Sequence, residues 1–166
     1  MSLFDRRKLL TCGLAFAGLS GCGFAPAYGP QGGAQRLQRQ VALNVPTDRN
    51  GYLLNRRLEE RLGRAEAAAY DLTVTVTTDR QGLGSTQDGR TTRFHLLGNA
   101  RMVLRAAGGD QVLFEGATSA FTAYSTTGST VATLAAERDA SERLMVILAD
   151  QITDWLIGIA ASLPQA

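Results

Sequence analysis

The stretch YDLTVTVT, residues Tyr70–Thr77, places an apolar side chain at every second position. A period of two residues is that of a β-strand, whose side chains point alternately to the two faces of a sheet. The tyrosine, leucine and valines would therefore face a core, and the aspartate and threonines would face water. This segment predicts a sheet with one buried face and one polar face.

Strand patterns also lie on both sides of this segment. Residues 41–45 alternate before Pro46, which would stop a short strand. A longer strand is expected over residues 93–105, with Gly98 as a candidate bulge. Its inward residues would be Phe94, Leu96, Ala100, Met102 and Leu104, and its outward residues Arg93, His95, Asn99, Arg101 and Arg105. Residues 81–89 between the two long strands read as a polar, glycine-rich turn.

The register of the fourth strand depends on the turn at Gly108-Gly109-Asp110. A two-residue turn would direct Leu113 and Glu115 inward, whereas a three-residue loop would direct Val112, Phe114, Gly116 and Thr118 inward. A slip of one residue exchanges the two faces of a strand. We prefer the second register, because it leaves the Glu115 carboxylate in water.

Two helices are predicted from apolar residues that recur every three or four positions. Leu54, Leu58 and Leu62 form the buried stripe of the first, which would be capped by Thr47 or Asn50 and end at Gly63. The second would run over about residues 133–163, with a stripe of Leu134, Leu144, Leu148, Ile152, Trp155, Leu156 and Ile159. We read Tyr124–Thr130 as the loop before it.

These segments together predict an α+β fold in the order β-α-β-β-β-α. The expected architecture is a two-layer α/β sandwich, in which a four-stranded, mostly antiparallel sheet carries two helices packed on one face. The other sheet face would remain uncovered.

Composition argues against several classes of function. The chain has 166 residues, enough for one packed domain. Three of its 17 basic and one of its 15 acidic residues precede Cys22, which leaves 14 of each and no strongly basic field for nucleic acid. No lysine follows Lys8, and His95 is the only histidine, so we expect no metal site, no cofactor and no enzyme activity.

The first residues have the layout of an export signal. Arg6, Arg7 and Lys8 precede the apolar run Leu9–Leu19, and Leu19-Ser20-Gly21-Cys22 resembles the lipobox of bacterial lipoproteins. We predict that residues 1–21 are removed, that Cys22 carries a covalent lipid, that residues 22–35 form a flexible tether, and that residues 36–166 form a single domain. The run is too short for a membrane-spanning helix. The export route, Sec or twin-arginine, stays open.

The lipobox cysteine opens the motif CGFAPAYG, Cys22–Gly29. This motif, with the predicted order of elements and the long last helix, resembles the LptE family of lipopolysaccharide-assembly lipoproteins, in its alphaproteobacterial branch. The resemblance implies a non-enzymatic outer-membrane lipoprotein that plugs the β-barrel LptD, assists its assembly and contacts lipopolysaccharide. Gly23, which is not aspartate, fits sorting to the outer membrane. An auxiliary lipoprotein of a lipid-transport ABC system is the alternative.

Arginines supply the candidate contacts with the barrel or with lipopolysaccharide phosphates, because the planar guanidinium suits bidentate phosphate binding. Arg93, Arg101 and Arg105 would share the uncovered sheet face, with Arg80 and Arg90 beside its turn. Alternatively, these side chains pair with Asp71, Asp79 and Glu115. We expect His95 to be an ordinary exposed residue, Asp150 and Asp154 to lie on a solvated helix face, and Phe121 and Trp155 to be core or interface residues.

Overall fold

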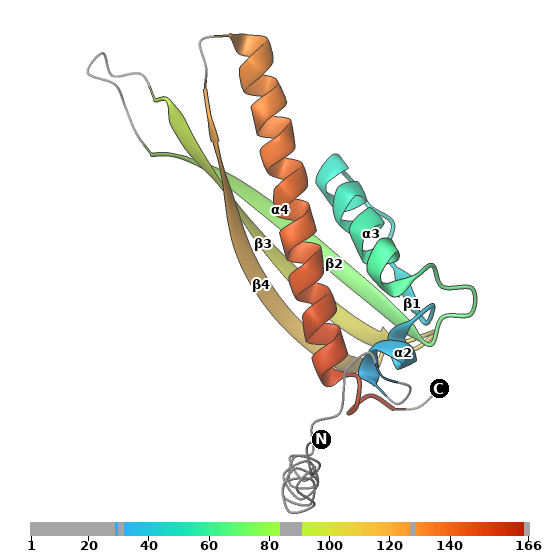
Figure 1. Ribbon diagram of the computed structural model, residues 1–166. Helices are drawn as coiled ribbons and strands as arrows, with labels where there is room; N and C mark the ends of the chain where they lie inside the picture. The colour runs from blue at the N-terminus through green and yellow to red at the C-terminus, as the bar shows by residue number, and fades with distance from the viewer. Residues whose placement is uncertain (1–28, 30–31, 84–90, 127–128, 165–166) are drawn as a thin grey trace, which may run out of the picture.

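A computed structural model describes residues 29, 32–83, 91–126 and 129–164 of the chain (Figure 1). Its sheet has four strands in the order β1-β2-β3-β4. β1 (Val41–Leu43) pairs in parallel with β2 (Tyr70–Gly82), and β2, β3 (Arg93–Ala106) and β4 (Val112–Ser125) are antiparallel neighbours. The predicted sheet and its mostly antiparallel character are confirmed.

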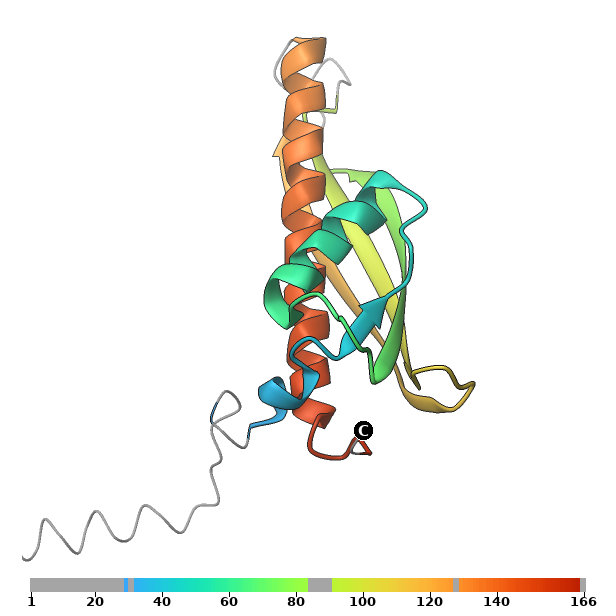
Figure 2. The same ribbon diagram turned by 90° about the vertical axis from the view of Figure 1, so that its right-hand side faces the viewer.

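Two helices pack side by side on one face of this sheet. They are α3 (Arg49–Leu62) and α4 (Thr130–Ile159), and Figure 2 shows both of them on the same side of the strands, with the opposite sheet face uncovered. A helix of 30 residues is about 45 Å long. α4 therefore runs the length of the sheet, and the predicted two-layer sandwich is confirmed.

The core lies between the two layers. It combines the predicted leucines of α3, the even-numbered residues Tyr70, Leu72 and Val74 of β2, and Leu144, Leu148, Ile152 and Leu156 of α4. Gly98 lies on the buried face of β3, where a Cβ would come within 3.0 Å of both Leu144 and Leu148. The missing side chain of Gly98 allows α4 to approach the sheet closely. The pairing of β3 with β4 is regular at Gly98, so the expected bulge is absent there.

The ends of α3 follow from its sequence. The Asp48 carboxylate accepts a hydrogen bond from the Gly51 N–H at 2.8 Å, so Asp48 is the N-cap instead of the predicted Thr47 or Asn50. Gly63 ends the helix as expected, with a φ of 76° that glycine adopts without strain.

A short helix precedes β1 that the sequence did not predict. α2 (Gly33–Leu37) packs on α4, with Ala34 and Leu37 buried. Three residues of the predicted tether thus lie in a helix. The signal segment and Cys22 lie outside the described residues, so the division of the chain into signal, tether and domain stays a prediction.

The irregularity in the sheet lies at the start of β4. Leu104 pairs with Phe114 but Arg105 pairs with Val112, which makes Leu113 an extra residue on β4. Glu115 is exposed and Phe114 packs against the core, so the preferred register is confirmed for most of the strand. Val112, however, is 49% exposed instead of inward, because the bulge reverses its phase.

The long helix also differs from its prediction at two positions. Leu134 and Trp155 are 47% and 52% exposed, although both were assigned to the buried stripe. Tyr124 and Ser125, predicted as loop, belong to β4. Within the described part of the chain, no helix is long and apolar enough to cross a membrane.

Candidate functional site

The uncovered sheet face carries three of the five predicted arginines. Arg93, Arg101 and Arg105 alternate along β3 with buried residues, so their side chains point away from the helices, as predicted. Arg93 and Arg101 are exposed and Arg105 is half-buried. A shallow hollow beside Arg101 is lined by hydroxyl and amide side chains of all three long strands: Thr75, Thr77, Asn99 and Ser119.

Charge pairing leaves much of this face available. Arg101 is 4.0 Å from the Glu115 carboxylate, at the limit of an ion pair, and both side chains are more than half exposed. Arg93 and Arg105 form no ion pair with any residue in the described ranges. The Asp71 carboxylate, predicted as a partner, instead accepts a hydrogen bond from the Gly108 N–H at 3.3 Å.

These arginines adjoin an apolar patch that the sequence did not predict. Phe121 is 62% exposed and lies opposite Leu97 in the antiparallel register. Its ring centroid is 5.0 Å from that of His95, which is half-buried and not freely exposed as predicted. The uncovered face therefore presents cationic and aromatic groups together. Strand alternation in residues 117–123 was the signal that could have placed Phe121 here.

Arg80 lies on the opposite face from the other candidates. Its guanidinium is 3.8 Å from the Glu137 carboxylate on α4 and 5.1 Å from the centre of the Phe94 ring. Proximity to Tyr124, and then to Glu137, raises the pKa of Arg80 above its ordinary value. Arg80, predicted to flank the turn beside the uncovered face, thus connects the far end of β2 to α4 and has its side chain on the helix face of the sheet. Arg90 lies outside the described residues.

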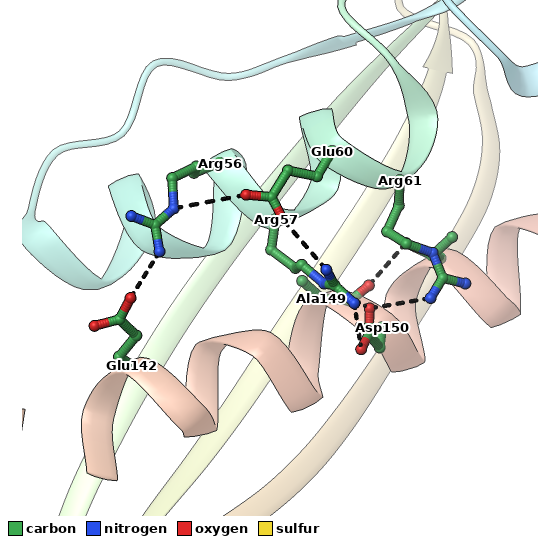
Figure 3. Close-up of polar contacts among 8 residues, drawn as sticks. Arg56, Arg57, Glu60, Arg61, Glu142, Ala149 and Asp150 are labelled. Atoms are coloured by element: carbon green, nitrogen blue, oxygen red, sulfur yellow. Dashed lines mark hydrogen bonds and ion pairs between the residues drawn. The ribbon is translucent and has the colours of Figure 1, made fainter. Parts of the chain in front are cut away.

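Asp150 and Asp154 of α4 form ion pairs with arginines of α3. Arg57 donates two hydrogen bonds to Asp150, and Arg61 lies 3.3 Å from the same carboxylate (Figure 3). Arg61 also lies 3.6 Å from Asp154. Asp150 is therefore a partly buried link between helices, which corrects the prediction of a solvated face. Hydrogen bonding to Asp150 is the main cause that raises the pKa of Arg57.

Trp155 is no core residue, since half of its surface is exposed. Its ring stacks on Phe114 of β4, with centroids 6.4 Å apart. Together with Gln151, Gly158 and Ile159 it borders a hollow between α4 and β4.

The chemistry of these surfaces is that of binding. Among the residues the structure describes, no group of three His, Cys, Asp or Glu side chains could hold a metal ion. The uncovered face offers guanidinium donors, hydroxyl groups and an aromatic ring, which suit an anionic or amphipathic partner.

Comparison with known families is decisive. A family model described as "LptE: Lipopolysaccharide-assembly" matches residues 38–156, which is most of the chain. The chain belongs to the LptE family. Membership places this LptE-family protein in lipopolysaccharide assembly and confirms the resemblance seen in the sequence. Comparison with curated proteins gave no match.

Solved structures share the fold of this LptE-family chain. A lipoprotein structure from Caulobacter crescentus has a TM-score of 0.66 and 23% identity, covering 79% of this chain and 98% of its own. A minor lipoprotein from Acinetobacter baumannii has a TM-score of 0.53 and 22% identity, covering 76% and 93%. Lipoprotein B from Nitrosomonas europaea has a TM-score of 0.52 and 15% identity, covering 74% and 84%.

Proposed function

We propose that this LptE-family protein is an outer-membrane lipoprotein that acts without catalysing a reaction. It plugs the lumen of the β-barrel LptD, assists the assembly of that barrel and contacts lipopolysaccharide during its passage to the cell surface. Its attachment to the membrane is a covalent lipid on Cys22.

The observation that carries this proposal is the uncovered face of the sheet. A strand face left without a covering layer, with two exposed arginines and an exposed phenylalanine on it, suits a partner that is both anionic and apolar. Lipopolysaccharide has phosphates and acyl chains, and the wall of a barrel lumen offers polar side chains. Arg93, Arg101 and Arg105 are the proposed contact residues on this face.

The position of α2 supports anchoring at one end of the domain. α2 packs against α4, and Figure 1 places it beside the last turns of that helix. Gly33 lies eleven positions after Cys22, and a fully extended chain of eleven residue steps spans at most about 36 to 40 Å. A lipid on Cys22 would therefore keep the α2 end of the domain within that distance of the membrane.

Purification of the acylated full chain from a detergent extract of the envelope tests this function. We expect a large outer-membrane β-barrel to copurify at a fixed ratio. Recovery of an inner-membrane ABC transporter instead would contradict the proposal and support an auxiliary lipoprotein of such a system.

A further inference from the structure

Strand β4 forms one edge of the sheet and has β3 as its only neighbour in the sheet order. It is 14 residues long, and Glu115 is its only charged residue. Edge strands are normally protected against pairing because they are very short or because they carry lysine or proline. At the other edge, β1 has only three residues and pairs only with Tyr70–Leu72, so the rest of β2 is itself an edge there and carries the charged residues Asp79 and Arg80. β4 is thus a long edge whose sequence offers little protection against pairing with another strand.

The unpaired backbone groups of β4 can be identified from two hydrogen bonds. The Thr126 N–H donates to the Thr92 carbonyl at 2.9 Å, so even-numbered residues bond to the β3 side. The Ala123 carbonyl accepts from the Arg143 guanidinium of α4 at 3.3 Å and therefore points away from β3. Because these directions alternate along an antiparallel strand, the N–H and C=O groups of residues 117, 119 and 121 also point outward.

A groove runs beside this edge on the helix side. It lies between Thr118 of β4 and the segment 151–159 of α4, and its lining is mostly apolar. Trp155, whose ring stacks on that of Phe114, forms one wall. A Cβ built on Gly158 would meet no atom within 4 Å, so the helix leaves open space here. An edge strand next to such a groove is the arrangement by which proteins bind an extended segment as an added strand.

We propose that β4 binds an extended segment of the barrel partner as a fifth strand of the sheet, with an apolar side chain of that segment in the groove beside Trp155. This inference rests on the proposed function for the identity of the partner. The wall of a closed barrel has no free strand edge. The segment is therefore a loop or terminal segment of the barrel protein.

The charges along the groove and the β4 edge restrict which sequences the bound segment can have. Asp154 is the only charged residue lining the groove, and its side chain is 73% exposed. The outward-pointing residues 117, 119 and 121 are alanine, serine and phenylalanine. The bound segment would thus be uncharged along most of its length, with a basic residue where it approaches the exposed Asp154 carboxylate, which it would share with Arg61 at 3.6 Å.

Proline substitution tests the main-chain bonds directly. Ser119→Pro removes one outward N–H and leaves the β3–β4 bonds in place, as edge prolines do. We expect the full acylated chain to keep its melting temperature within a few degrees and to recover about tenfold less barrel on copurification. The control is Thr78→Pro at the opposite edge: the Val74 N–H bonds to Asn44, so the even-numbered N–H groups of β2 face away from β3. This variant should recover the barrel normally. Normal recovery by a folded Ser119→Pro protein would overturn the inference.

Photo-crosslinking gives a second test that does not depend on the proline variant being folded. p-Benzoyl-phenylalanine is placed at Ala117, Ser119 or Phe121 of the otherwise unchanged chain. We expect crosslinks to one short segment of the barrel, with the crosslinked site moving two residues for each two-residue step along β4. Scattered crosslinks on a copurifying barrel, or crosslinks to a second copy of this chain, would overturn the proposed strand addition but leave the proposed function standing. Failure of the barrel to copurify would contradict the proposed function itself.

Discussion

Arg57 on α3 and Asp150 on α4 form a two-bond ion pair, with Nε 3.0 Å from Oδ1 and Nη2 3.2 Å from Oδ2. Both side chains are about one-third exposed, and Arg61 shares the same carboxylate at 3.3 Å. The pair joins helices whose linked residues are 93 positions apart in the chain. It adds a polar link between α3 and α4 at the margin of the apolar core that packs both helices on the sheet.

Asp150→Asn should lower the free energy of unfolding by about 1 kcal/mol, because a bidentate, partly buried ion pair is stronger than an exposed one. Urea denaturation of the domain measures this. Asp139→Asn is the matched control, since Asp139 pairs with Arg143 within α4 and both side chains are more than half exposed. That change should cost less than about 0.5 kcal/mol. Equal effects of the two substitutions would show that the ion pair between α3 and α4 stabilises the domain no more than an exposed pair within one helix.

Gly98→Val should destabilise the domain by about 1–3 kcal/mol, because the new side chain would overlap Leu144 and Leu148 and push α4 from the sheet. Gly158→Ala, in open space on the same helix, should instead stabilise it by about 0.5–1 kcal/mol. Thermal or urea unfolding of both variants checks the opposite signs. A Gly98→Val protein as stable as the wild type would contradict the close approach of α4.

Cys22→Ser should abolish acylation, because serine has no thiol to receive the lipid. The protein would then remain uncleaved or appear as a soluble periplasmic form. Labelling cells with radioactive palmitate, followed by recovery of the protein, measures the modification. Label on the Cys22→Ser protein would contradict the assignment of this residue as the anchor.

Reversing Arg93 and Arg101 to Glu should weaken the barrel complex or lipopolysaccharide binding while leaving the fold intact, because exposed substitutions usually change stability by less than about 0.5 kcal/mol. Control arginines on the helices should form no ion pair. This excludes Arg56 and Arg61 of α3, since Arg56 pairs with Glu142 at 2.7 Å and Arg61 with Asp150.

Arg49 and Arg138 are better controls for that double reversal. Both are exposed, lie on the helices and form no ion pair within the described residues. Copurification of the barrel and binding of labelled lipopolysaccharide are compared for the two double variants. Equal loss in both, or in neither, would show that the uncovered face is not the contact surface.

The alternation in Tyr70–Thr77 predicted the sheet because side-chain direction in a strand depends only on local geometry. The same rule places Arg80 on the helix face, but the predicted strand stopped at Thr77, whereas β2 continues to Gly82. The face on which Arg80 lies could therefore be read from the sequence, and it was missed because the end of the strand was predicted too early. The exposure of Val112 could not be predicted in this way, since the extra residue Leu113 reverses the alternation of side-chain directions and no feature of the sequence marks it.

The remaining features could not be predicted from the sequence because they depend on contacts between elements that are distant in the chain. Spacing of the leucines predicted both helices, but it could not show that Asp150 would meet Arg57, because this depends on how α3 crosses α4. Trp155 lies one position from Leu156 on the helix, and only the position of β4 decides which of the two is buried. The candidate groove beside Trp155 consequently emerged from packing alone.

Depletion of this protein in its own bacterium tests the central claim most directly, with lipopolysaccharide at the cell surface measured by a labelled antibody on intact cells. The account predicts that surface lipopolysaccharide falls while lipopolysaccharide accumulates inside the envelope, and that both recover when the wild-type chain is restored. Normal surface lipopolysaccharide after complete depletion would contradict it.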